Sequence, residues 1–348
     1  MKRSVFFLLL LTLPAYALFA QKAQQYKVGA IGFYNLENLF DTEDDPLIND
    51  SEFLPSGKKN WNETIYQEKQ GNMARVISEL GVELSPDGIS ILGVAEIENR
   101  RVLEDLVNHP KLAARNYQII HFDSPDERGI DVGLLYQAKY FRPTSSQAVL
   151  MPIYNPDGST RKTRDILFVS GLYDGEPLHI LVNHWPSRSG GEAASQPYRN
   201  AAALICKNIT DSLMQADPNA KIIIMGDLND DPTSPSVKKI LAANFKKEDT
   251  KKGELFNPMY DFFKRGIGTL AYQDSWNLFD QIIISHGLIN EKAGGFQFYN
   301  ARIFNENYLF QKSGQYRGYP HRTFSGDTYI GGFSDHLPVF VYLAKPIQ

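Results

Sequence analysis

The segment from Lys221 to Pro232, KIIIMGDLNDDP, places a carboxylate directly after an apolar run. Residues 222–225 are continuously apolar, which is typical of a strand covered on both faces. Gly226 permits a close backbone approach, and polar and turn residues follow from Asp227 onward. The pattern predicts a carboxylate held at the mouth of a rigid sheet, although an ordinary acidic turn fits this segment alone equally well.

The same segment has some features of a calcium-binding loop. Asp227, Asn229 and Asp231 have the spacing of the first three ligand positions of such a loop. Pro232 stands where that loop requires glycine, and Lys238 stands where it requires glutamate. The sequence therefore excludes a calcium loop of this type.

Five other polar clusters lie beside apolar runs. Glu96 comes directly after the apolar run ISILGVA, where a carboxylate must be paired, protonated or bound to a metal ion. Taken singly, most of the other clusters fit structural roles such as a turn cap or a buried histidine, whereas Asp280 interrupts an apolar run and fits such a role least well. They comprise Asn35 and Glu37 after KVGAIGFY, His184 after LHILVN, Asp280 within FDQIIIS, and Asp335 and His336 before LPVFVYL.

Taken together, these residues fit the chemistry of phosphate-ester hydrolysis. That reaction needs a cation to offset charge on the phosphoryl oxygens, a group to orient water, and an acid for the leaving oxygen. The two histidines and Asp280 could supply proton transfer and its orienting partner. Hard oxygen ligands without a cysteine or histidine cluster suit Mg²⁺ or Mn²⁺ rather than a structural zinc ion. These oxygen ligands are Glu37, Glu96, Asp227 and Asp335.

The composition is that of an ordinary globular protein. The chain has 348 residues, of which 43% are hydrophobic and 22% charged, so it can bury a sizeable core. Its formal net charge of −4 opposes tight, non-specific duplex binding but does not exclude an enzyme whose metal ions offset the charge. We find no repeat or low-complexity linker, and one domain is the simplest division.

The N-terminal residues 1–20, MKRSVFFLLLLTLPAYALFA, have the layout of a secretory signal peptide. Two basic residues precede an apolar stretch that is too short to span a bilayer, and small residues follow it. The sequence thus predicts a secreted or periplasmic protein without a transmembrane anchor. Cys206 is the only cysteine, so no internal disulfide is possible.

Apolar patterns elsewhere predict a mixture of strands and helices. The expected strands cover residues 27–34, 89–95, 117–122, 131–136, 166–173, 178–182, 221–225, 279–285 and 337–343. The expected helices cover about 65–80, 101–108 and 196–215. A Gly- and Tyr-rich region between the last two strands has no clear pattern. Helix-connected strands together with hairpins indicate a mixed sheet or two sheets, with helices outside.

Six motifs occur in the order and type of a known superfamily: FYNLEN, GVAEIENR, VNHWPSR, MGDLND, WNLFDQIIIS and FSDHLPVF. Between about residues 27 and 343 the chain thereby resembles the endonuclease/exonuclease/phosphatase superfamily, also called the DNase I-like fold. The resemblance implies an α/β (α+β) fold, a four-layer, two-sheet β-sandwich flanked by helices on both outer faces. It would form one domain over residues 21–348, with a divalent-metal phosphoesterase site at one end of the sheets.

The resemblance also implies a role for each site residue. Glu96 looks like the main metal ligand, surrounded by Asn35, Glu37 and Asp335. Asp227 would orient the attacking water and Asn229 would hold a phosphate oxygen. Asp280 would pair with His336, while His184 would stabilise or protonate the leaving group. Arg128 or Arg199 would contact phosphate, but no motif decides between the two arginines.

The favoured function is an exported, monomeric phosphodiester hydrolase that uses Mg²⁺ or Mn²⁺ and acts on DNA or RNA by metal-activated water attack on phosphorus. The Pro-Ala-Trp-Cys-Asp-Arg motif of the inositol-polyphosphate phosphatases is replaced here by DSWNLFDQI, which argues against that branch. Two alternatives stay open: hydrolysis of a phospholipid headgroup or small phosphorylated metabolite, and a binding protein with a vestigial site. A basic groove beside the metal site would favour nucleic acid, and an apolar rim would favour lipid.

Overall fold

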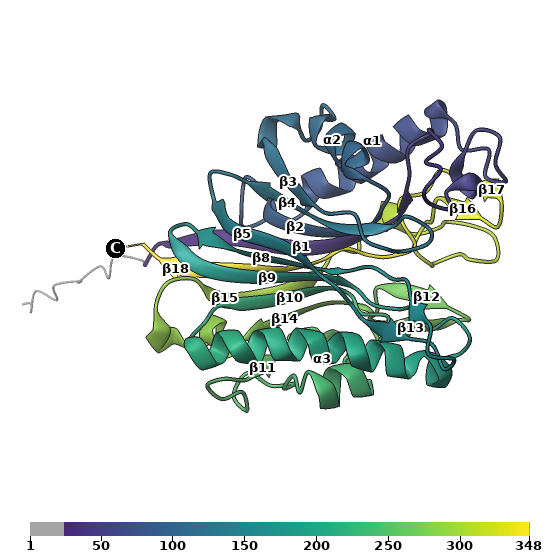
Figure 1. The fold of residues 1–348 in the computed structure, drawn as a ribbon. Coiled ribbons are helices and arrows are strands. Elements are labelled where there is room, and N and C mark those ends of the chain that lie inside the picture. The colour runs from purple at the N-terminus through teal and green to yellow at the C-terminus, as the bar shows by residue number, and fades with distance from the viewer. Residues whose placement is uncertain (1–23, 348) are drawn as a thin grey trace, which may run out of the picture.

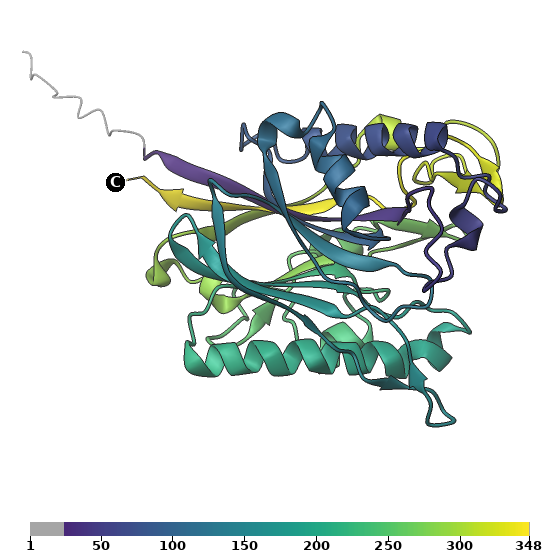
Figure 2. The ribbon, with the colours of Figure 1, turned by 45° about the horizontal axis from the view of Figure 1, so that its top comes forward.

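Two six-stranded β-sheets pack face to face in the computed structural model, which describes residues 24–347 (Figures 1 and 2). The predicted signal peptide at residues 1–20 lies outside the described residues. The first sheet has the strand order β15-β18-β1-β2-β4-β3. Its strands are β1 (Tyr26–Leu39), β2 (Ile89–Ile97), β3 (Tyr117–His121), β4 (Asp131–Gln137), β15 (Gln297–Ile303) and β18 (Val339–Pro346).

The second sheet has the strand order β11-β14-β10-β9-β8-β5. Its strands are β5 (Phe141–Val149), β8 (Ile166–Tyr173), β9 (Glu176–His184), β10 (Ile222–Asp227), β11 (Leu255–Phe256) and β14 (Asp280–Ser285). Both sheets are mixed. In the first sheet β1 pairs parallel to β2 and antiparallel to β18, and in the second sheet β10 pairs parallel to β9 and antiparallel to β14. Three two-stranded hairpins complete the sheet structure: β6 (Ile153–Tyr154) with β7 (Thr160–Arg161), β12 (Leu270–Tyr272) with β13 (Ser275–Asn277), and β16 (Phe324–Ser325) with β17 (Thr328–Tyr329).

Helices cover the outer faces of both sheets (Figure 1). Helices α1 (Glu63–Glu79) and α2 (Arg100–Asn108) lie outside the first sheet, and α3 (Glu192–Ala216) lies outside the second. Helix α1 begins at Asn62, whose side chain accepts hydrogen bonds from two backbone amides of the first turn. A short helix, α4 (Tyr260–Lys264), and several single turns connect the remaining strands. The predicted four-layer sandwich is confirmed.

One hydrophobic core fills the space between the two sheets and extends to α1 and α2. At its centre Gly93 of β2 lies so close to Met225 and Val182 of the opposite sheet that an added Cβ would come within 3.0 Å of each. A second core lies between the second sheet and α3 and contains the free, buried Cys206. Within residues 24–347 no helix is long and apolar enough to cross a membrane.

Two of the predicted strands continue further than their apolar runs. β1 extends through Asn35 and Glu37 to Leu39, and β2 extends through Glu96 to Ile97. The pairing of β1 with β2 shifts register after Asn35, and Glu37 and Glu96 have left-handed backbones, with φ of 49° and 57°. Polar residues here belong to irregular strand ends rather than to loops, because a bulge re-aims side chains without ending the pairing.

Gly226 directly precedes Asp227 and is closely packed against the neighbouring strand β9. Its φ is 155°, and an added Cβ would lie 2.2 Å from the backbone oxygen of Asn183. We expect Gly226→Ala to push β10 away from β9 and to lower the free energy of unfolding by about 2 kcal/mol or more, as overpacked sites do. Urea denaturation followed by circular dichroism measures the effect.

Gly71→Ala is the matched control for this substitution. Gly71 lies within α1, where the nearest atom to an added Cβ is 3.6 Å away. The same change should therefore stabilise the protein by roughly 0.5–1 kcal/mol, as expected in a helix interior. Equal effects of the two substitutions would contradict the packing described for Gly226.

Candidate active site

Three of the predicted site residues lie side by side at one end of the second sheet. Asp227, the last residue of β10, pairs with His184 on β9 and with Asp280 on β14. All three side chains are buried. The strand register therefore fixes their relative positions, which the sequence motifs alone could only suggest.

A hydrogen bond between the sheets connects Asn35 to this row. Asn35 Nδ2 on β1 donates to Asp227 Oδ2 over 3.1 Å, and the backbone amide of Asn229 donates to Asp227 Oδ1 over 2.9 Å. Burial raises the pKa of Asp227 to about 7, although the attraction of His336 opposes that shift. Both carboxylate oxygens thus have fixed directions, as a water-orienting group requires.

Asn229 lies two residues after Asp227, and both residues line one cavity at this end of the sheets. Its Nδ2 donates to the backbone oxygen of Trp185 over 3.0 Å, and Arg188 Nε donates to the backbone oxygen of Asn229 over the same distance. The guanidinium of Arg188 also contacts Asp230 and Asp231. Arg188 therefore fixes the loop that carries Asn229, and the second Nδ2 hydrogen remains for a ligand oxygen.

Glu96 reaches toward the row from the first sheet. Its Oε2 accepts a hydrogen bond from the backbone amide of Asn38 over 3.0 Å, while its Oε1 lies 3.8 Å from His184 Nε2. The left-handed backbone at Glu96 has a cost of about 1–3 kcal/mol. Its side chain is 15% exposed, so it can meet a ligand from the cavity.

His336 and Asp280 form a buried pair, as predicted. His336 Nδ1 lies 2.7 Å from Asp280 Oδ2, and His336 Nε2 lies 3.7 Å from Asp227 Oδ2. Burial alone would lower the pKa of His336, but the carboxylates of Asp280 and Asp227 outweigh it and hold that pKa well above its ordinary value. His336 therefore enters the site as a charged hydrogen-bond donor.

His184 differs from His336 in its charge. Burial, followed by repulsion from Arg164 and Arg128, holds the pKa of His184 well below its ordinary value. Its Nε2 lies 3.5 Å from Asp227 Oδ2, and its buried Nδ1 has no hydrogen-bond partner within residues 24–347. A neutral imidazole can stabilise a leaving group by donating a hydrogen bond, but it holds no additional proton to release.

Glu37 is surrounded by donors from the protein itself. Its Oε2 accepts from the backbone amide and the hydroxyl of Thr323, at 2.8 and 3.0 Å. The fully buried Lys69 Nζ lies 4.0 Å from the same oxygen, and Arg322 Nε lies 3.4 Å from Oε1. Burial raises the pKa of Glu37 to about 7 and lowers that of Lys69 to about 8. This placement does not favour the metal-ligand role expected for Glu37.

Asp335 keeps one oxygen free beside this cluster. Arg322 donates to Asp335 Oδ2 over 2.6 Å, whereas Asp335 Oδ1 accepts no hydrogen bond within the described chain. Glu96 Oε1 is equally free. These two oxygens are the hard donors that Mg²⁺ or Mn²⁺ prefers, so Glu96 and Asp335 fit a divalent cation better than Glu37 does.

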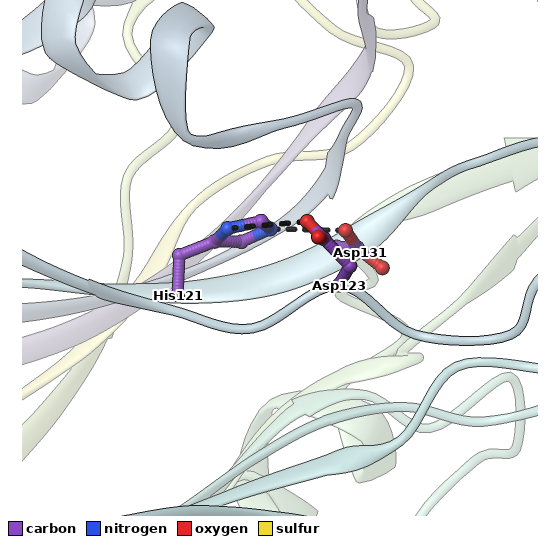
Figure 3. A group of neighbouring side chains, drawn as sticks. All are labelled: His121, Asp123 and Asp131. Atoms are coloured by element: carbon purple, nitrogen blue, oxygen red, sulfur yellow. Dashed lines mark hydrogen bonds and ion pairs between the residues drawn. The ribbon is translucent and has the colours of Figure 1, made fainter. Parts of the chain in front are cut away.

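Two groups of side chains within residues 24–347 bring potential metal-ligand atoms within 4.8 Å of one another. One group is Asp227, Asp280 and His336 in the row described above. The other is His121, Asp123 and Asp131, where His121 Nε2 lies 2.9 Å from Asp131 Oδ2 (Figure 3). The backbone amide of Ser124 also donates to Asp131, so this second network holds β3 to the start of β4. Asp131 pairs with Ile97 of β2, the residue that follows Glu96.

A group of basic residues, called the basic wall below, lines a cavity of about 440 Å³ together with Glu96, Asp227 and the two site histidines. Arg164, which the motifs did not identify, is 5% exposed and donates to Asp126 Oδ2 and to the backbone oxygen of Trp185, at 3.0 and 2.8 Å. Its buried Nε has no partner in the described part of the chain. The cationic side chains of the wall are Arg128, Arg161, Lys162 and Arg164. The basic run RKTR at 161–164 was a signal in the sequence for this wall.

Only one of the two predicted phosphate-binding arginines lies at the cavity. Arg128 lines it with a half-exposed side chain. Arg199 is fully buried, with Nε 2.7 Å from Asp230 Oδ1 and a terminal nitrogen 2.8 Å from Ser195 Oγ. Arg199 fixes α3 to the loop after β10, which corrects the expectation that it could contact phosphate.

Comparisons with known proteins agree with this fold. A family model described as Endonuclease/Exonuclease/phosphatase family matches residues 30–345. Curated proteins give no significant match. Two similar solved structures are from Bacteroides thetaiotaomicron, and each is 17% identical with a TM-score of 0.54. The first is an endonuclease/exonuclease/phosphatase family protein (93% of this chain and 97% of that chain covered), and the second is a mannosyl-6-phosphatase (90% and 99%).

A third similar structure is D. rerio TDP2 in complex with a single-strand DNA product. It is 13% identical, with a TM-score of 0.53, and the match covers 91% of this chain and 98% of that chain. At these identities the three structures show that the fold is shared.

The His336–Asp280 pair leads to a prediction for the metal-free protein. The imidazole of His336 should titrate above its ordinary value in the wild type, because Asp280 and Asp227 stabilise the charged form. In Asp280→Asn the neighbouring charge is lost and burial dominates, so the titration midpoint should fall. NMR of the imidazole nitrogens across pH measures both midpoints, with the distant, half-buried His179 as an internal control. An unchanged midpoint in the variant would refute the pairing.

Proposed function

The chain belongs to the endonuclease/exonuclease/phosphatase family, and on that basis we propose that it is a divalent-metal-dependent phosphodiesterase that acts on nucleic acid. The observation that carries the proposal is the cavity that the basic wall lines together with Glu96, Asp227 and the two histidines. A cavity lined by both cations and oriented acids fits a phosphodiester with a water molecule beside it.

Each side of the cavity would have a separate task in this reaction. Asp227, with both oxygens already oriented, would align the attacking water and accept its proton. The charged His336 would donate a hydrogen bond to a phosphoryl oxygen, with Asn229 as a second donor. His184, neutral and close to Glu96, would donate a hydrogen bond to the leaving oxygen.

Glu96 and Asp335 would hold the divalent cation, each with the oxygen that the protein leaves free. When bound, such a cation supplies Lewis-acid stabilisation of the charge that develops on phosphate. Asn35 would act on Asp227 across the sheets rather than as a ligand. Arg322 would limit the movement of Asp335 and add positive charge beside the site.

The basic wall supports nucleic acid as the substrate. Four cationic side chains line this cavity although the whole chain has a net charge of −4, and the acids beside them, Asp126 and Glu127, offset only part of that local charge. A local basic surface on an acidic protein concentrates a polyanion at the site without general duplex affinity. Phosphatases occur in the same family, so a phosphomonoester such as a hexose phosphate is the second candidate.

A substrate screen tests the proposal directly. Purified protein would be incubated with single-stranded DNA, RNA, plasmid DNA, sphingomyelin and mannose 6-phosphate, with Mg²⁺, with Mn²⁺ and with EDTA. We expect cleavage of nucleic acid that stops in EDTA. Phosphate release from the sugar alone would contradict the proposal, and full activity in EDTA with no metal present would refute the metal requirement.

Two isosteric substitutions should separate metal binding from water orientation. Glu96→Gln removes a ligand charge, so the metal concentration for half-maximal activity should rise about tenfold or more while the rate falls. Asp227→Asn removes the acceptor, so the rate should fall by a factor of about 100 or more at a nearly unchanged metal requirement. A metal titration of both variants measures the difference. Equal metal requirements in Glu96→Gln and the wild type would exclude Glu96 as a ligand.

The basic wall can be tested with a matched pair of arginines. Arg128→Ala should raise the KM for single-stranded DNA about tenfold and weaken its salt dependence, because Arg128 faces the cavity and is half exposed. Arg199→Ala should mainly lower stability, by about 2 kcal/mol or more, because the buried Asp230 loses the guanidinium at 2.7 Å and keeps only Arg188, at 3.4 Å, as a cationic partner within residues 24–347. Steady-state kinetics at two salt concentrations and urea denaturation separate the two effects.

A further inference from the structure

A second cavity, of about 510 Å³, lies on the other side of the segment that carries Asp335 and His336. Asp335 lines this cavity, whereas the next residue, His336, lines the cavity with the basic wall. Arg322 also lines the second cavity and joins Asp335 to Glu37. The proposed reaction centre therefore lies between a basic cavity and this second one.

Tyrosine side chains dominate the second cavity. Tyr272 is 64% exposed and Tyr316 is 36% exposed, and both line the same cavity as Tyr319. The rings of Tyr316 and Tyr319 are 5.7 Å apart between centroids and inclined by 52°. The rest of the lining alternates polar with small apolar groups: Gln273, Asp274, Gln315, Arg322 and Asp335 with Leu270, Ala271 and Pro320.

One of the three tyrosines is fixed in place by hydrogen bonds. The hydroxyl of Tyr319 donates to Asp274 Oδ1 and accepts from the backbone amide of Asp274, at 2.5 and 2.6 Å. Asp274 lies in the two-residue turn of the hairpin β12–β13, where it and Gln273 have left-handed backbones. The turn thereby connects Tyr319, and through ring contact Tyr316, to the hairpin.

The hairpin is also joined directly to the reaction centre. Leu270 of β12 forms a β-bridge with His336, and the backbone amide of Leu337 donates to the backbone oxygen of Thr269 over 2.8 Å. A ligand part held by the tyrosines is therefore in a fixed position relative to the group beside Asp227. This is the geometry of a subsite for the part of the substrate next to the reacting phosphate.

We propose that the tyrosine cavity binds an unpaired nucleobase adjacent to the scissile phosphate, so that the enzyme acts on single-stranded nucleic acid. This inference rests on the proposed function, and it adds the substrate class. A basic groove combined with exposed aromatic rings is the arrangement that binds single strands, because every base offers a flat face for stacking. A base paired within a duplex would have to leave its helix to reach Tyr316.

Other ligands fit the lining less well. An acyl chain would need a continuous apolar surface, whereas amide and carboxylate groups of Gln273, Asp274 and Gln315 interrupt this one. The same groups can pair with the donors and acceptors on the edge of a base. A hexose could also stack on tyrosine, and the experiment below includes it as a competitor.

The test is a comparison of Tyr316→Ala, Tyr316→Phe and the control Tyr299→Ala. Tyr299 is 62% exposed and lines a different cavity, with Phe256 and Phe262. Substrates are a single-stranded oligonucleotide and the same chain with abasic sugars around the cleavage site. Tyr316→Ala should raise the KM for the first substrate about tenfold at similar kcat, since stacking contributes roughly 1–3 kcal/mol per base. It should leave the abasic substrate unaffected, and the other two variants should resemble the wild type.

A second readout does not depend on hydrolysis. An oligonucleotide that contains 2-aminopurine should lose fluorescence on binding to the wild type in EDTA, because stacking quenches this base, and the loss should be absent with Tyr316→Ala. If the wild type cleaves nucleic acid without quenching, the base subsite is refuted and the proposed function stands. If quenching occurs without cleavage of nucleic acid, the proposed function fails and the subsite stands. Displacement by mannose 6-phosphate but not by a nucleotide would overturn the assignment to a base.

Discussion

The burial of Asp227 is the constraint on which the rest of the site depends. A carboxylate at this depth is stable only when its oxygens are hydrogen-bonded and positive charge lies nearby. Here the donors come from both sheets, Asn35 from one and Asn229 from the other, and the charge comes from His336. The distance and the register between the two sheets must therefore stay fixed, because a shift would break these hydrogen bonds and leave the Asp227 carboxylate buried without partners. The close approaches at Gly93 and Gly226 serve that same requirement, because Gly93 lets the opposite sheet's Met225 and Val182 pack against β2, and Gly226 lets β10 approach the backbone of β9.

Positive charge is distributed around the acids in a graded way. His336 is buried and charged, whereas His184 is buried and neutral. Lys69 is fully buried beside Glu37, and its ammonium group donates hydrogen bonds to the Thr323 hydroxyl and to the backbone oxygen of Phe333. Arg322 then spans two carboxylates at the surface. Burial lowers the pKa of both imidazoles; at His336 the carboxylates of Asp280 and Asp227 outweigh that effect, whereas at His184 repulsion from Arg164 and Arg128 adds to it. An isolated sequence position does not show this difference, since it arises only from the packed neighbours.

Much of the fold could be predicted from the sequence because its central strands are buried on both faces. β10 and β14 have continuous apolar runs, and the hairpin between β8 and β9 has a strong turn signal at Asp174 and Gly175. β5 is an edge strand with a largely exposed, polar sequence and has no such pattern, so it escaped prediction. The site was predictable where a motif lies at the end or the start of a strand, as at His184, the last residue of β9, and Asp280, the first residue of β14. Lys69 and Arg322 were not, because a lysine on a helix and an arginine in an irregular loop are usually solvated, and their carboxylate partner Glu37 lies far away in the sequence.

The antiparallel pairing of β1 with β18 determines from which end of the fold a second protein or an anchor joined to the chain would extend. Tyr26 pairs with Pro346, so both ends of the described chain leave the fold together, while Asn35 and His336 lie toward the other end of these strands. An anchor, tag or fused domain joined at either end of the described chain would therefore extend from the end of the sandwich opposite Asn35 and His336. A protein tethered in this way presents its cavities outward, and a second protein joined to one terminus lies next to anything joined to the other.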